Sequence, residues 1–307
     1  MATNPAKIAR VVGTCRAAAR HYGASTLSVF ARVARLKLRE RFRPQESFLW
    51  GLADPATGED EIRRVTSRSQ LYRLQAVHNP MSLTYLTEEK AVFYAYCTGA
   101  GIRTPALFGV YHRDGGWSLV GDRKRLTDRA GWQHFFRDEV PEAFVVKPAK
   151  GVYARGLQVL LRSTTGDELT DSSGRPTTID ALLDTLDADR RYDVFVIQER
   201  LFNHSELEAL SGRHAVQTAR VVTLVEGRTP RILFACFKVI AGDGDSDNFD
   251  YGRSGNLLAD VDVDTGTLHR ARGRHESGFG LAEHTSHPET KIEIDGFQLP
   301  FWAETRE

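Results

Sequence analysis

Apolar side chains recur at helical spacing at the start of the chain. The pattern over residues 5–43 breaks near "HYGAS", where Ser25 is expected to cap a second helix. Arginines occupy one side of that second helix. The apolar face predicted on its other side comprises Leu27, Phe30, Val33 and Leu36 or Leu38. After a connector with prolines, residues 61–77 again favour a helix, so the N-terminal region is predicted to be helical.

Helical and alternating patterns are mixed between residues 79 and 200. One helix is predicted to run from about Thr87 to the Gly99–Gly101 cluster. A second helix is predicted over "TIDALLDTLD", with Thr178 as its cap. The runs that read as short strands are "ALFGVYH", "WSLVG", "AFVVKP", "GLQVLLRS" and "DVFVIQERL".

Strand patterns alone follow residue 201, separated by turns rich in Gly, Asp, Asn or Pro. The predicted strand segments are "HAVQTARVVTLVEG", "RILFACFKVIAGDG", "NLLADVDVDTGTLHRA" and "KIEIDGFQLP". A mixed first half and an antiparallel second half predict an α+β fold with at least two lobes. The expected regions are a helical, basic segment at 1–78, a first lobe at 79–200 and an antiparallel lobe at 201–307.

Composition narrows the class of protein. The 307 residues are 41% hydrophobic and 26% charged, which is typical of a globular chain. Three widely spaced cysteines exclude a disulfide scaffold and a cysteine-based zinc site, and suit a reducing cytoplasm. No run of about 18 apolar residues is present, so no membrane-spanning segment is expected.

Charge is concentrated at the N-terminus although the whole chain carries only +1. Residues 1–43 hold ten lysines and arginines against Glu40 alone, a net +9 that leaves −8 for the remainder. One interpretation is a helix on an anionic membrane surface, as in a peripheral protein at the inner face of a membrane. The favoured interpretation is instead a solvated helix that packs on its own domain. Nucleic acid is a less expected partner than a membrane surface.

The segment "FVVKPAKGVYARG" at residues 144–156 raises the question of phosphate binding. It is not a P-loop, because its lysine precedes the glycines and Gly156 is followed by Leu157. In isolation it is typical of a hairpin turn. About 50 residues further on, however, "DVFVIQERL" ends in Gln198 and Glu199, at a strand exit suited to an adenine edge. A strand-end cation and a glycine loop beside such a strand exit would suit a phosphate chain.

With these motifs in order, the sequence resembles the ATP-grasp superfamily, in its sugar-transfer-associated branch. The matching segments are "NPMSLTYLTEEKAVF", "GIRTPALFGVY", "FVVKPAKGVYARGLQVL", "FVIQERLFNHSEL", "QTARVVTL", "DNFDYGRSGNLLADVDVDTGTL" and "HPETKIEIDGFQLPFW". The resemblance implies an ATP-grasp fold with two lobes around a nucleotide cleft, and it implies ATP and Mg²⁺ as cofactors.

The resemblance also implies a role for each matching residue at the nucleotide. Lys90 and Lys147 would contact the phosphates, and the loop from Gly151 to Gly156 would cover them. The residues implied to form the hinge for adenine and ribose are Gln198, Glu199 and Leu201.

A second set of residues is implied to act at the transferred phosphate and the acceptor. Arg220 would face the transferred phosphate, and Lys238 is a weaker candidate for the same role. The residues that match the family's "DN…G" element, near the acceptor substrate, are Asp247, Asn248 and Gly255.

The metal site has no assigned residues. The family's metal ligands follow a "WD…E-x-N" pattern on a final pair of strands, and this sequence ends at "LPFWAETRE", where that pair would begin. Asp260, Asp262 and Asp264 alternate on one predicted strand face, but this is not where the family binds metal. Loss of a strand pair would leave an open sheet edge, so the expectation is a truncated product or pairing with another chain in a homo-oligomer.

The function expected from the resemblance is that of an ATP-dependent ligase. A carboxylate would be activated as an acyl phosphate and transferred to an amine or hydroxyl acceptor, on a small-molecule or sugar-linked substrate. The setting would be modification of a surface polysaccharide or a sugar-linked metabolite. The alternative is a nucleotide-binding regulator or scaffold that does not turn over.

Overall fold

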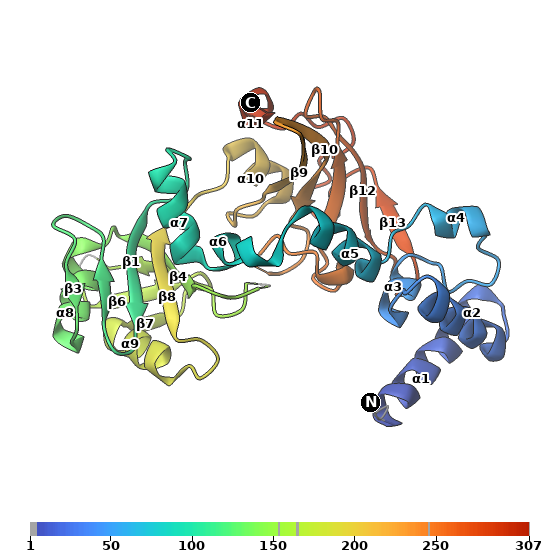
Figure 1. Cartoon of the computed structure of the whole chain (residues 1–307), viewed down its shortest axis with the longest axis horizontal. Helices are drawn as coiled ribbons and strands as arrows, with labels where there is room; N and C mark the ends of the chain where they lie inside the picture. Colours follow the sequence, from blue (N-terminus) through green and yellow to red (C-terminus); the bar gives the residue numbers. More distant parts are fainter. Residues whose placement is uncertain (1–4, 153, 164–165, 245, 307) are drawn as a thin grey trace. The chain divides into compact units, whose positions relative to one another are not determined.

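The computed structural model describes residues 5–306 except 153, 164–165 and 245. The chain divides into two compact units. Residues 79–202 form one of them, and the segments before and after this range together form the other. Each unit combines an antiparallel sheet with helices, and further helices stand at the N-terminus (Figure 1). The predicted α+β class with a helical N-terminal region is confirmed.

The unit of residues 79–202 is built on an eight-stranded sheet with the order β3-β2-β1-β8-β4-β5-β6-β7. Its strands are β1 (Leu107–His112), β2 (Gly116–Ser118), β3 (Arg125–Leu126), β4 (Ala143–Pro148), β5 (Gln158–Arg162), β6 (Glu168–Asp171), β7 (Pro176–Thr178) and β8 (Val194–Glu199). Its helical segments are η1 (Met81–Leu83), α6 (Tyr85–Glu88), α7 (Lys90–Gly99), α8 (Arg129–His134), η2 (Phe135–Glu139) and α9 (Ile179–Ala188). Strand β8 lies between β1 and β4, which brings its carboxyl end beside segments far away in the sequence.

Strand alternation sends the side chains of β4 to two different surroundings. Phe144 and Val146 enter the main core together with residues of α8 and α9. The neighbouring Val145 and Lys147 point to the opposite face, where Tyr94 of α7 packs on Ala149 and Val196. Figure 1 shows α7 on one side of this sheet and α8 and α9 on the other. The face covered by α7 is the one that carries the candidate site.

The start of α7 differs from the prediction. The helix begins at Lys90 rather than near Thr87, because the Glu89 side chain accepts a hydrogen bond from the Val92 N–H and caps the helix there. The residues around Thr87 form the separate short turn α6. The predicted cap of α9 is confirmed, since the Thr178 hydroxyl accepts from the Ala181 N–H at 3.1 Å.

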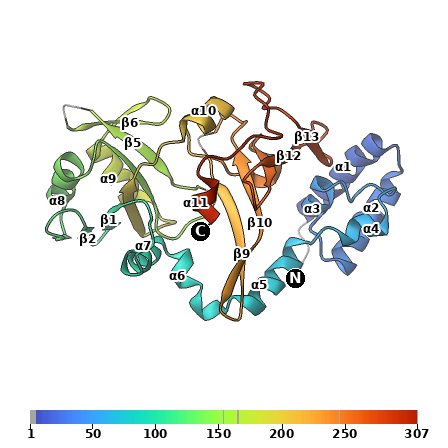
Figure 2. The same cartoon turned by 90° about the horizontal axis from the view of Figure 1, so that it is seen from above.

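The second unit contains a five-stranded antiparallel sheet with the order β13-β12-β11-β10-β9. Its strands are β9 (Ala219–Glu226), β10 (Thr229–Val239), β11 (Leu257–Val261), β12 (Leu268–Arg274) and β13 (Leu281–His284). The helical segments beside it are α10 (Ser205–Ser211), η3 (Asp250–Gly252) and α11 (Trp302–Arg306). Figure 2 shows the long β9–β10 hairpin of this sheet.

The last predicted strand is wrong. The segment "KIEIDGFQLP" forms single β-bridges, such as that between Thr267 and Gln298, in place of a strand. Its apolar residues Ile294 and Leu299 are instead buried in the core that α10 and the sheet share. These residues therefore belong to an irregular segment that packs on the core. An alternating apolar pattern alone does not distinguish such a segment from a strand.

From residue 5 onward, where the structure describes the chain, five helices form the N-terminal part of this same unit. They are α1 (Pro5–Tyr22), α2 (Thr26–Arg39), α3 (Pro44–Leu49), α4 (Glu59–Arg63) and α5 (Arg68–His78). Ser25 caps α2 as predicted, accepting from the Ser28 N–H at 3.0 Å. Phe279, from the β12–β13 connection, packs into the cluster of α1, α2 and α3 and ties these helices to the sheet.

The predicted apolar face of α2 is wrong in part. The buried residues are Val29, Val33 and Leu36, whereas Leu27 and Leu38 are 77% and 80% exposed. Both sets of positions satisfy helical spacing, and packing against α1 and α3 selects the first. Within the described residues, no helix combines the length and the apolar character needed to cross a bilayer.

Candidate functional site

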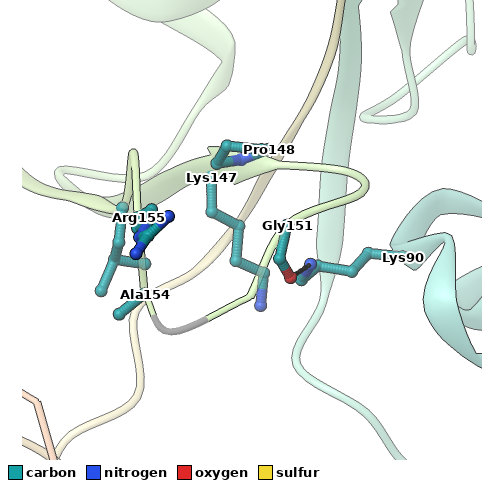
Figure 3. Close-up of a pocket in the computed structure, with 7 residues that line it drawn as sticks. Lys90, Lys147, Pro148, Gly151, Ala154 and Arg155 are labelled. Atoms are coloured by element: carbon teal, nitrogen blue, oxygen red, sulfur yellow. Dashed lines mark hydrogen bonds between the residues drawn. The ribbon is translucent and has the colours of Figure 1, made fainter. Parts of the chain in front are cut away.

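A pocket lies where β4 ends in the unit of residues 79–202. It encloses about 260 Å³, part of which is open to solvent. Its lining residues are Lys90, Lys147, Pro148, Gly151, Ala154, Arg155 and Leu157. Figure 3 shows the Lys147 side chain extending between the Lys90–Gly151 contact on one side and the segment of Ala154 and Arg155 on the other. The pocket therefore gathers the two lysines and the glycine loop that the sequence singled out.

Lys147 is a half-buried cation without a carboxylate partner among the described residues. Its ammonium donates a long hydrogen bond of 3.4 Å to the Tyr94 hydroxyl and lies 5.7 Å from the centre of that ring. Burial, and secondly the like charge of Lys90, lower the pKa of Lys147 from its ordinary 10.5 to about 8. A bound anion would offset both effects.

Lys90 connects the first residue of α7 to the glycine loop. Its ammonium donates to the carbonyl of Gly151 at 3.1 Å and to that of Ala149 at 3.3 Å, and its backbone N–H donates to Ala149 at 2.8 Å. Burial lowers the pKa of this lysine, an effect that nearby Glu89 partly opposes. Two of the three ammonium donors are thus directed at the loop, which leaves one for a ligand.

The glycines of the loop pack on the ring of Pro148. A Cβ at Gly151 would lie 3.3 Å from the proline Cβ, and one at Gly156 would lie 2.9 Å from the proline Cγ. Gly156 also has a φ of +74°, in the left-handed region that favours glycine. Close approach and backbone conformation therefore both require glycine at position 156.

Tyr94 joins the lysine to the strand exit of β8 and was not identified from the sequence. Its hydroxyl donates to Gln198 Oε1 in a buried contact, and it accepts from Lys147. Burial raises the pKa of Tyr94 to about 12, which keeps the hydroxyl protonated as a donor. The only available signal was its spacing four residues after Lys90, which places both side chains on one face of α7.

The strand exit itself is arranged mainly through backbone groups. The Gln198 amide is 7% exposed and donates to the Glu199 carbonyl at 3.2 Å. The Glu199 N–H and carboxylate bind the backbone of Ala106, at 2.8 and 2.9 Å. The N–H of Leu201 has no hydrogen-bond partner among the described residues. Gln198 and Glu199 thus hold the segment in place, and Leu201 presents a free donor.

Two of the residues predicted in the second unit, Lys238 and Asp247, contact each other. Lys238 on β10 lies 3.3 Å from the Asp247 carboxylate and donates to the Thr218 hydroxyl at 3.1 Å. Thr218 in turn donates to Asp247. Arg220 on β9 is exposed and has no ion pair among the described residues. The charge of Lys238 is therefore largely neutralised, while that of Arg220 is available.

Asn256 organises the loop that carries Asp247 and Asn248. Like Tyr94, it was not predicted from the sequence. This residue is 1% exposed. Its amide donates to the carbonyls of Ser246 and Asn248 at 2.7 and 3.1 Å, and its oxygen accepts from two backbone N–H groups of the preceding turn. Gly255 has a φ of +80°, and a Cβ there would lie 3.2 Å from the Gly242 Cα. The "DN…G" element is thus a tightly bonded loop.

Comparison with known proteins identifies the family. The model of the sugar-transfer associated ATP-grasp family matches residues 68–307, most of the chain. The chain belongs to this family. No curated protein and no solved structure gives a match. Membership of this ATP-grasp family indicates ATP binding and a function of the ATP-dependent ligase type.

Asp260 and Asp262 are engaged by other groups and are not placed for the Mg²⁺ that ATP-grasp proteins generally use. Among the residues that the structure describes, no group of three or more His, Cys, Asp or Glu side chains is placed to hold a metal ion. Asp260 pairs with Arg270 and Arg272, at 3.3 and 3.5 Å. Asp262 lies beyond the end of β11 and accepts three hydrogen bonds from the turn that follows. The prediction of three aspartates on one strand face is wrong, because the strand ends at Val261.

The histidines near the C-terminus have structural surroundings. His284 is the last residue of β13. His287 is fully buried and donates from Nε2 to the Ile240 carbonyl at 2.9 Å. Its Nδ1 accepts from the backbone N–H groups of Glu289 and Thr290. Both ring nitrogens of His287 are occupied, so it is no candidate ligand.

Proposed function

We propose that this protein is an ATP-dependent ligase that activates a carboxylate. An oxygen of the carboxylate attacks the γ-phosphorus of ATP, ADP leaves, and an acyl phosphate forms. The nitrogen or oxygen of an acceptor then attacks the acyl carbon, and inorganic phosphate leaves. The substrate would be a small-molecule or sugar-linked compound, in the modification of a surface polysaccharide or related metabolite. The protein's part in such a reaction is positioning and charge stabilisation.

The observation that carries the proposal is the half-buried Lys147, which has no carboxylate partner in the described part of the chain. A protein rarely keeps such a charge unless a ligand compensates for its desolvation. Lys90 adds a second cation at the same pocket, and the glycine loop allows backbone N–H groups to approach an anion closely. A polyphosphate supplies the negative charge that this pocket lacks.

The strand exit of β8 supports a nucleotide in preference to a simple phosphate. Leu201 offers a free backbone N–H, and the Glu199 carbonyl retains one lone pair beside the bond from Gln198. A donor and an acceptor two residues apart match the N1 and N6 edge of adenine. Because Tyr94 bridges Gln198 and Lys147, the base end and the phosphate end are held by one hydrogen-bonded chain.

On the acceptor side, the charges favour Arg220 over Lys238 as the group that faces the transferred phosphate. Lys238 is committed to Asp247, and Arg220 is not paired among the described residues. We assign no protein ligand to Mg²⁺, since no acidic side chain is among the described residues that line the pocket of Lys90 and Lys147. The alternative function is that of a nucleotide-binding regulator or scaffold without turnover.

Thermal denaturation with ATP, in the presence and absence of Mg²⁺, tests the nucleotide assignment. ATP at about 100 times its dissociation constant should add roughly 2.7 kcal/mol to the stability of the folded state. Lys147→Met should lose most of this gain, whereas Lys150→Met, at an exposed lysine three residues away, should keep it. An unmutated protein that ATP does not stabilise would contradict the proposal.

Turnover separates the two functions. Release of ADP and phosphate that depends on a carboxylate and an amine together would establish the ligase. Stabilisation by ATP without any such release, across a panel of acids and amines, would favour the regulator. The two functions share the nucleotide contacts, so mutations at Lys147 or Tyr94 cannot distinguish them.

A further inference from the structure

Helix α2 has two apolar faces, and only one of them is buried. The buried face packs Val29 and Val33 against α1 and α3. The opposite face, here termed the outer face of α2, consists of Leu27, Phe30, Ala31 and Leu38. At 100° per residue these positions fall within an arc of about 100°. Leu27 and Leu38 are 77% and 80% exposed and Phe30 is 40% exposed, so the stripe is open to solvent along the helix.

Among the described residues, unpaired cations lie on α1, in the last turn of α2 and in the segment that follows α2. Within the described residues, seven exposed basic side chains of the first 43 positions have no acidic partner within ion-pair distance: Arg10, Arg16, Arg20, Lys37, Arg39, Arg41 and Arg43. Arg32 and Arg35 contrast with them, because both pair with Glu59, at 3.8 and 2.6 Å. Helix α2 continues directly into the basic stretch from Lys37 to Arg43, next to Leu38.

We propose that the outer face of α2 docks this protein on an anionic lipid surface. The leucines and Phe30 would enter the headgroup region, and the cations from Lys37 to Arg43, next to Leu38, would contact lipid phosphates. An interfacial helix requires this combination of an apolar stripe with basic flanks. This inference concerns where the protein acts, and it does not depend on the proposed ligase reaction.

Two other partners explain the face less well. Nucleic acid would use the cations, but contacts to its phosphate backbone would leave Leu27 and Leu38 uncovered. A second copy of the chain would cover the leucines, but it would bring two sets of unpaired cations together. An anionic bilayer satisfies both the apolar and the charged part of the surface.

Vesicle co-sedimentation of the full chain tests the proposal. We expect strong binding to phosphatidylcholine vesicles that contain about one-third phosphatidylglycerol, and weak binding to phosphatidylcholine alone. Raising the salt from about 0.1 M to about 1 M should weaken binding severalfold, because it screens the cations. The double variant Leu27→Ser with Leu38→Ser should lower the partition coefficient by on the order of tenfold or more.

A matched control variant distinguishes binding through the outer face of α2 from nonspecific binding through any exposed leucine. Leu233→Ser replaces a leucine that is 46% exposed on β10, outside the N-terminal helices, and should bind vesicles like the unmutated chain. Both leucines of the double variant are largely exposed, so it should keep its thermal denaturation profile. Vesicle binding that the double variant retains in full, or no preference for anionic lipid, would overturn the proposal. The proposal would also be overturned if the unmutated chain and the Leu233→Ser variant were dimers in sedimentation and the double variant were a monomer. Tight binding of an oligonucleotide without binding of vesicles would overturn it as well.

Discussion

Replacement of Lys147 by methionine should stabilise the free protein. Burial and the charge of Lys90 lower the pKa of Lys147 from 10.5 to about 8, which means that the folded state disfavours its charged form. At about 1.4 kcal/mol per pH unit, this difference corresponds to roughly 3 kcal/mol. The ammonium is only half-buried, so solvent screening reduces the gain from Lys147→Met to about 1–3 kcal/mol near pH 7.

The dependence on pH gives this prediction its specific signature. A lysine whose pKa is lower when folded than when unfolded destabilises the protein fully below the folded pKa, here about 8. The cost disappears as the pH rises from about 8 to 10.5, because the folded protein then loses a proton that the unfolded chain retains. The stability advantage of Lys147→Met should therefore shrink across this window.

Urea denaturation at about pH 7 and about pH 10 measures both effects. Lys150→Met is the control, since Lys150 is exposed and its removal should change stability little at either pH. A Lys147→Met protein that is clearly less stable than the unmutated chain at pH 7 would refute the reasoning. A difference between the two proteins that does not change with pH would refute the electrostatic origin.

Three further substitutions test the supporting contacts. Tyr94→Phe leaves a buried amide oxygen without its donor and should cost about 1–3 kcal/mol in urea denaturation, with weaker ATP binding in calorimetry; unchanged stability and affinity would remove Tyr94 from the site. Gly156→Ala adds a clash with Pro148 to a left-handed φ, so in thermal denaturation it should destabilise more than Gly174→Ala, which has a similar φ and open space; equal effects would exclude the clash. Asn256→Ala removes the central bonds of the 241–248 loop and should cost about 2–4 kcal/mol in urea, whereas a loss below about 0.5 kcal/mol would contradict its organising role.

Local sequence patterns were sufficient to predict the strand that carries Lys147. They were also sufficient to predict the family to which the chain belongs. The alternation in "AFVVKP" follows from the two sides of a strand, and the cap at Thr178 follows from a hydroxyl within reach of a backbone N–H. Such features depend on residues close in sequence, so they can be predicted without knowing the fold. The motif order from residue 79 onward was likewise sufficient to recognise an ATP-grasp chain.

Tertiary structure decided which of several compatible patterns is used. In α2, two sets of apolar positions fit a helix, and only contact with α1 and α3 selects Val29 and Val33 for burial. Tyr94 joins the site because β8 is inserted beside β4, a pairing between segments about 50 residues apart. The pairing of Lys238 with Asp247 likewise depends on how a loop folds back on its sheet. The burial and the ion pairs of a side chain depend on neighbours that are distant in the sequence. They therefore cannot be predicted from local sequence patterns alone.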